Sequence, residues 1–168
     1  MDVACISYKE TGFFSQTVVD YIDNVPQLKP FYSYRPDLKG FAELLADKKV
    51  VADRENLATI LTEQYSRISD SGFSISDLVN QNILSLKAEN TYTITTGHQL
   101  NIFAGPLYFI YKIVTAIKLA RELKTQFPDK NFVPVYWMAS EDHDFAEINY
   151  TNIGGKKVHW WYEAAGAT

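Results

Sequence analysis

One stretch in the middle of the chain alternates strand, helix and strand patterns, and this order most constrains the fold. Residues 91–96 and 132–138 are runs of β-branched and aromatic residues, and Gly97 is expected to end the first strand. Between the two runs, a helix pattern starts at Pro106 and continues to Phe127. A crossover helix of this length lets the two strands lie parallel with a right-handed connection. The sequence therefore predicts an α/β fold with a partial parallel sheet.

The first 90 residues carry helix patterns instead, with apolar residues recurring every three or four positions between breakers. These patterns cover residues 14–22, 38–45, 57–68 and 77–84. The proline-flanked aromatic segment 30–36 is expected to be extended. We predict a helical N-terminal region over residues 1–90. It is expected to pack on the α/β core, of which residues 91–168 form the first part.

A β-hairpin is predicted after the second strand. Gly154-Gly155 separates two strand-like runs, residues 147–153 and 156–162, with the spacing of a two-residue turn. Pro134 predicts a bulge or a free edge in the preceding strand, because proline cannot donate a ladder hydrogen bond. Two parallel strands and a hairpin form a thin sheet, so we expect a truncated chain or a sheet edge covered by association.

Composition narrows the class of protein. Hydrophobic residues are 46% of the 168 residues, enough for the core of one domain. A balance of 16 Lys and Arg against 20 Asp and Glu favours neither nucleic acid nor a membrane surface as partner. The sequence shows no apolar run long enough for a membrane span and no secretory signal pattern at its start. With a single cysteine, Cys5, an intramolecular disulfide is impossible, and we expect a cytoplasmic protein.

Polar clusters follow both predicted strands, Thr96–Gln99 after the first and Ser140–Asp144 after the second. In an open parallel sheet, ligands bind outside the carboxyl ends of the strands, where the loops converge. The two clusters are therefore expected to form one site. Crowding three acids and a histidine after an apolar strand costs energy unless a cation, a basic substrate group or a protonated histidine compensates the charge. Lys112, on the first turns of the predicted helix, could reach the same edge.

Other interpretations of these clusters stay open. Asp142 and Asp144 could be turn formers, with His143 a hydrogen-bonded side chain in the turn. The five residues that could bind zinc or manganese in a metal-dependent hydrolase are His98, Glu141, Asp142, His143 and Asp144, although consecutive residues after a strand point in different directions. A non-catalytic binding module with an exposed sheet edge is a further alternative. Neither loop matches a phosphate-binding glycine pattern.

The order and spacing of several segments resemble one known family, the BshC cysteine ligases of bacillithiol synthesis. The matching segments are Thr96-Gly97-His98-Gln99, Gly105-Pro106-Leu107-Tyr108, Tyr111-Lys112, Val133-Pro134-Val135, Ser140-Glu141-Asp142-His143-Asp144-Phe145 and Glu147-Ile148-Asn149. The family often has two glutamines after Thr-Gly, where this chain has His98-Gln99. Its members also continue well beyond 168 residues, into the rest of the core and a helical coiled coil.

The resemblance implies a Rossmann-like, nucleotidyltransferase-like core that joins cysteine to the amine of a glucosamine-malate conjugate through an amide bond. It implies ATP as the energy source and a homodimer formed mainly through the coiled coil. His98 and Gln99 would contact the activated carboxylate or phosphates, while Asp142, His143 and Asp144 hold the acceptor amine and take its proton. The remaining residues assigned to binding are Thr96, Gly97, Gly105, Tyr108, Lys112, Ser140 and Glu141, with no resident metal. If the missing portion supplies nucleotide contacts, this chain alone would be inactive.

Overall fold

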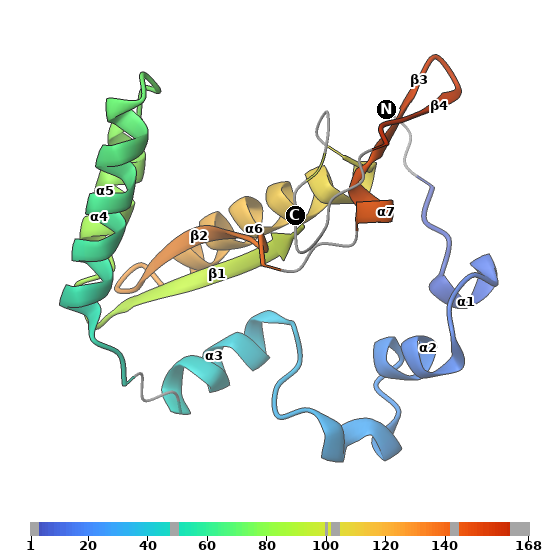
Figure 1. Ribbon diagram of the computed structural model, residues 1–168. Helices are drawn as coiled ribbons and strands as arrows, with labels where there is room; N and C mark the ends of the chain where they lie inside the picture. Colours follow the sequence, from blue (N-terminus) through green and yellow to red (C-terminus); the bar gives the residue numbers. More distant parts are fainter. Residues whose placement is uncertain (1–3, 48–50, 100, 102–104, 142–144, 162–168) are drawn as a thin grey trace. The chain divides into compact units, whose positions relative to one another are not determined.

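The chain forms two compact units, Met1–Lys49 and Val50–Thr168, which are described separately. The computed structural model describes residues 4–47, 51–99, 101, 105–141 and 145–161 (Figure 1). Both units contain helices, and the helices of the second unit that precede the sheet end at residue 85. The division of the chain at residue 90, which rests on sequence pattern, stays a prediction.

The first unit consists of short helices. They are α1 (Tyr8–Thr11), α2 (Gln16–Ile22), the 3-10 helix η1 (Pro26–Phe31) and α3 (Leu38–Asp47). A capping box starts α1, because the Ser7 side chain accepts from the Glu10 amide while the Glu10 carboxylate accepts from the Ser7 amide. The predicted helices α2 and α3 are confirmed. The extended conformation predicted for residues 30–36 is wrong at its start, where Pro30 lies inside η1.

The second unit begins with α4 (Arg54–Asp70) and α5 (Asp77–Ser85), a pair that confirms two further predicted helices. Arg54 joins this pair to the sheet, since its guanidinium donates to the carbonyls of Leu86 at 2.9 Å and Thr91 at 3.1 Å. Thr91 is buried, and its hydroxyl donates to the Ser85 carbonyl at 2.6 Å. These bonds fix the point where the first strand begins.

The sheet of the second unit contains β1 (Thr91–His98) and β2 (Asn131–Met138), which are parallel as predicted. Between them α6 (Leu107–Gln126) lies along one face of the sheet (Figure 1). Its buried residues Ala116, Ala120 and Leu123 form the core with Val133 of β2. This strand-helix-strand unit confirms the α/β fold class.

One local prediction about this sheet is wrong. Gly97 does not end β1, because it pairs with Trp137 and the strand continues through His98. The strand can continue there since glycine has no side chain: a Cβ at Gly97 would lie 2.8 Å from the Trp137 carbonyl oxygen. The prediction for Pro134, a bulge or a free edge, is confirmed in its second form. Pro134 pairs with Ile94 in an uninterrupted register, and among the described residues β2 pairs with β1 alone, so its other edge is free.

The predicted hairpin is confirmed, with β3 (Tyr150–Ile153) antiparallel to β4 (Lys156–His159). Gly154 and Gly155 form the turn with φ angles of 56° and 76°, the left-handed conformation that a type I′ turn requires. The strand expected from residue 147 starts later, because residues 145–148 form the short helix α7 (Phe145–Ile148). The hairpin lies beyond the carboxyl ends of β1 and β2 (Figure 1). Among the described residues, no helix is both long and apolar enough to cross a membrane.

Candidate functional site

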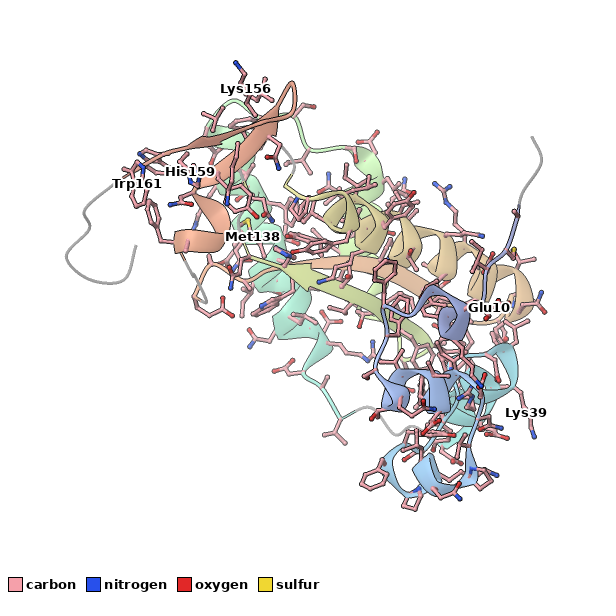
Figure 2. The ribbon with its side chains drawn as sticks, turned by 90° about the vertical axis from the view of Figure 1, so that its right-hand side faces the viewer. Glu10, Lys39, Met138, Lys156, His159 and Trp161 are labelled. Carbon is pink, nitrogen blue, oxygen red and sulfur yellow. The ribbon has the colours of Figure 1, made fainter. Side chains whose placement is uncertain are left out.

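The segments that follow β1 and β2 lie at the same edge of the sheet. His98 is the last residue of β1 and pairs with Met138, the last residue of β2, which Figure 2 labels beside the hairpin. The amide of Ala139 then donates to the His98 carbonyl at 3.2 Å. Parallel pairing therefore brings the start of both polar clusters together. The residues predicted to be catalytic in the second cluster, Asp142, His143 and Asp144, lie outside the described residues.

His98 is held by hydrogen bonds to both ring nitrogens. Its Nε2 lies 2.8 Å from the hydroxyl of Tyr108, and its Nδ1 lies 2.9 Å from the amide nitrogen of Asn101. The same Asn101 nitrogen donates to the Gln99 carbonyl at 2.9 Å. Phe109 packs edge-on against the imidazole, with ring centroids 5.8 Å apart. The imidazole is therefore fixed in position rather than free to rotate.

A cavity of about 470 Å³ opens beside this histidine. The loop after β1 and the start of α6 line one side of it, and β3 of the hairpin lines the other. The lining residues are His98, Asn101, Gly105, Pro106, Leu107, Tyr108, Tyr150, Thr151 and Asn152. The cavity thus lies where an open parallel sheet is expected to bind ligands.

The start of α6 gives this cavity a favourable electrostatic character for anions. Leu107 begins the helix, and Pro106 precedes it in an extended conformation. The first amides of a helix have no partners within it, and together with the helix dipole they favour negatively charged oxygens. The cavity could therefore hold a carboxylate or phosphate group.

Lys112 and Tyr136 both form hydrogen bonds to the end of β1. The Lys112 ammonium donates to the Gly97 carbonyl at 3.2 Å and lies 5.6 Å from the centre of the Tyr108 ring. The Tyr136 hydroxyl donates to the His98 carbonyl at 3.0 Å, and burial raises the pKa of its phenol above the usual value. Lys112 thus reaches the carboxyl edge, as its position in the sequence suggested.

The structure explains why position 105 is a glycine. Its φ angle is +62°, and a Cβ built on it would lie 2.6 Å from the side chain of Asn101. Glycine at this position therefore makes room for the asparagine that contacts His98.

The other predicted binding residues do not line this cavity. Thr96 lines a separate cavity of about 170 Å³ between β2 and α6, with Ile113 and Ala116 among its neighbours. Glu141 accepts a hydrogen bond from the Trp137 indole at 3.3 Å, and the Ser140 amide donates to Met138. The side-chain oxygen of Gln99 is buried and has no hydrogen-bond partner among the described residues. Of the predicted residues, His98, Gly105 and Tyr108 line the larger cavity.

Sequence reasoning missed Asn101 and the hairpin residues Tyr150, Thr151 and Asn152. Asn101 follows His98-Gln99 closely, so its position in the loop was a signal that could have identified it. The hairpin itself was predicted. Its position beside the carboxyl edge depends on tertiary packing, which the local sequence pattern does not predict. Figure 2 shows His159 and Trp161 of the same hairpin, whose rings stack with centroids 6.0 Å apart.

Metal binding has no geometric support in the part of the chain that is described. No group of three or more His, Cys, Asp or Glu side chains there could hold a metal ion. Three of the five candidate ligands, at positions 142–144, lie outside those residues.

Fold and site together define a Rossmann-like α/β domain with a cavity at the carboxyl edge of its parallel strands. Comparison with known families narrows this class. Residues 1–168 match the family described as "Bacillithiol biosynthesis BshC, N-terminal Rossmann-like domain", and the chain belongs to this family.

Relatives of known sequence agree with this assignment. A protein from Flavobacterium johnsoniae is 50% identical over 99% of the chain, and one from Flavobacterium psychrophilum is 48% identical over 99%. A more distant relative from Bacillus mycoides is 34% identical over 83%. All three carry the name "Putative cysteine ligase BshC". The chain spans 31% of the length of each Flavobacterium relative and 25% of the Bacillus one.

Proposed function

We propose that this chain is the N-terminal part of a ligase that joins cysteine to the amine of a glucosamine-malate conjugate in bacillithiol synthesis. Membership of the BshC family supports the pathway, and the names of the relatives support the cysteine ligase activity. The observation that carries the proposal is the cavity at the carboxyl edge, which His98 and Tyr108 line beside the start of α6.

The cavity suits the carboxylate side of such a reaction. A free carboxylate must be activated before an amine can attack it, and ATP is the proposed source of that activation. The residues at hand fit an anionic group, because the start of α6 favours negative charge and the Tyr108 hydroxyl can donate to an oxygen. In this proposal, these residues hold and orient the carboxylate or a phosphate.

The amine must lose a proton when the amide bond forms. We assign this step to the second cluster, Asp142, His143 and Asp144, because a histidine flanked by carboxylates can serve as a general base. In the sequence, this cluster directly follows Ser140 and Glu141, which come after the end of β2.

The proposal extends to the whole protein. Its relatives are about three times longer than this chain, so the remaining contacts to nucleotide and acceptor are assigned to the portion beyond residue 168. We propose a cytoplasmic homodimer formed mainly through a coiled coil in that portion, with no nucleic acid or membrane as partner.

An assay of amide formation tests this function. The full-length protein that contains this chain is incubated with cysteine, the glucosamine-malate conjugate and ATP, and the product is measured by mass spectrometry. We expect His143→Ala to lower turnover at least about tenfold, since general bases typically contribute about 10²–10⁴-fold. Lys118→Ala is the control, because Lys118 is exposed and pairs with Glu122 on the helix surface.

Two results would contradict the proposal. Absence of the amide product from the full-length wild-type protein would remove the ligase activity. Unchanged turnover in His143→Ala would leave the activity but remove the assigned base. The 168-residue chain alone is expected to yield no product, and product from it would show that the site is complete without the rest of the protein.

A further inference from the structure

We infer that Asn101 is a positioning residue, which fixes the protonation pattern of His98 and thereby makes the Tyr108 hydroxyl a hydrogen-bond donor facing the cavity. The inference rests on the proposed function only in assigning the cavity to substrate. The hydrogen-bond geometry stands independently of which substrate binds.

The orientation of the Asn101 amide is the first step. Its Nδ2 lies 2.9 Å from the Gln99 carbonyl oxygen, which can only accept a hydrogen bond. If the amide were turned over, two acceptor oxygens would face each other at that distance. The NH₂ group of Asn101 therefore points toward Gln99 and, with its second hydrogen, toward His98.

This orientation determines which nitrogen of His98 carries the proton. The Nδ1 of His98 lies 2.9 Å from the same NH₂ group, so it must present its lone pair there. The backbone oxygen of Gln99 lies 3.1 Å from Nδ1 and would favour a proton on it. The contact with Asn101 is shorter, and a proton on Nδ1 would place two donors against each other. The neutral imidazole therefore carries its proton on Nε2.

Tyr108 is the next member of the chain of bonds. With the proton on Nε2, His98 donates to the Tyr108 oxygen across 2.8 Å. A hydroxyl that accepts from one side keeps its own hydrogen for another acceptor. Tyr108 lines the cavity and is about half exposed, so that hydrogen is available to a ligand. The direction of the bonds, from Asn101 through His98 to Tyr108, thus presents a donor suited to a carboxylate, phosphate or carbonyl oxygen.

Gly105 supports the same conclusion from the opposite side of the loop. A Cβ on Gly105 would lie 2.8 Å from the Asn101 side-chain oxygen and 2.6 Å from its Cγ. The left-handed backbone at Gly105 leaves space that the Asn101 amide fills. The loop is therefore shaped to hold the amide against His98 as well as to begin α6.

The test is the tautomer of His98, measured by NMR of histidine-labelled protein. Long-range proton–nitrogen spectra distinguish Nδ1–H from Nε2–H imidazoles at alkaline pH, where the ring is neutral. The chain has three histidines, and the signal missing from His98→Gln assigns the one of interest. In the wild-type chain we expect Nε2–H to exceed Nδ1–H by about tenfold, the effect of one hydrogen bond. A predominant Nδ1–H form would overturn the inference.

Two variants separate positioning from folding. Asn101→Asp places a carboxylate, which can only accept, opposite Nδ1, so we expect the ratio to reverse in favour of Nδ1–H. The matched control Asn80→Asp makes the same charge change at an exposed position of α5 and should leave the ratio unchanged. An unchanged ratio in a folded Asn101→Asp protein would overturn the inference, and the wild-type spectrum decides it if that variant does not fold.

Tyr108→Phe shows which neighbour sets the tautomer. The variant removes the hydroxyl but leaves Asn101 in contact with Nδ1, so Nε2–H should remain predominant. A switch to Nδ1–H would mean that Tyr108 sets the proton position and would contradict the role of Asn101. These spectra need neither substrate nor turnover, so their outcome is independent of the amide-formation assay.

Discussion

Replacing Gly97 with alanine should loosen the carboxyl end of the sheet, where the candidate site begins. A Cβ at this position would lie 2.8 Å from the Trp137 carbonyl oxygen and 3.1 Å from the Trp137 Cβ. The nearer contact is to backbone in the paired strand, so the strands must shift to relieve it. Overpacking of this kind costs about 1–3 kcal/mol. Reduced entropy of the unfolded chain offsets roughly 0.4–1 kcal/mol of that cost.

The net expectation is a loss of about 1–2 kcal/mol in the free energy of unfolding, or roughly 2–8 °C in Tm for a chain of this size. Urea unfolding followed by tryptophan fluorescence measures it, because Trp137, Trp160 and Trp161 all belong to the second unit. Thr95→Ser, on an exposed position of the same strand, is the control and should change stability by about 0.5 kcal/mol or less. A Gly97→Ala protein as stable as wild type would refute the packing argument.

Three further substitutions test the second unit. Thr91→Val should cost about 0.5–1.5 kcal/mol, because the 2.6 Å hydrogen bond from the buried Thr91 hydroxyl to the Ser85 carbonyl is lost, whereas Thr91→Ser keeps it; a Thr91→Val protein as stable as the wild type in urea would contradict this. Leu123→Ala should cost about 2–5 kcal/mol by leaving a cavity under α6, and a loss no larger than that of the exposed Leu84→Ala would disprove it. Burial raises the pKa of Tyr136, so its contribution to stability is present below pH 10.0 and is lost as pH rises through the folded-state pKa. In urea titrations across alkaline pH, the free energy of unfolding should decline less for Tyr136→Phe than for the wild type. Identical declines would show that Tyr136 does not contribute to this pH dependence.

Much of the fold could be predicted because its signals are local. The helix pattern starting at Pro106 and the two β-branched runs imply a parallel pair, and the structure has that pair in uninterrupted register. Gly154-Gly155 likewise predicts a tight turn, since two left-handed residues in succession are easiest for glycine. The backbone conformation of these elements is determined mainly by residues that are close in sequence.

The errors occur where tertiary contacts decide the outcome. Glycine normally weakens a strand, yet Gly97 continues β1 because the Trp137 backbone lies too close for any side chain. The candidate site shows the same limit: His98 and Tyr108 were identified from the chain, while Asn101 and the hairpin residues become visible only once the loop and the hairpin pack beside them.

We propose that the carboxyl-edge cavity of this domain binds the substrate of a cysteine ligase. Calorimetric titration of the full-length protein with the glucosamine-malate conjugate, in the presence and absence of ADP, tests it most directly. We predict saturable binding that weakens at least about tenfold in His98→Ala, as expected when a half-buried hydrogen-bonding group is removed, and that persists in Lys118→Ala. Equal affinity in the wild-type and His98→Ala proteins, or no binding to the wild type, would show that this cavity does not bind the conjugate.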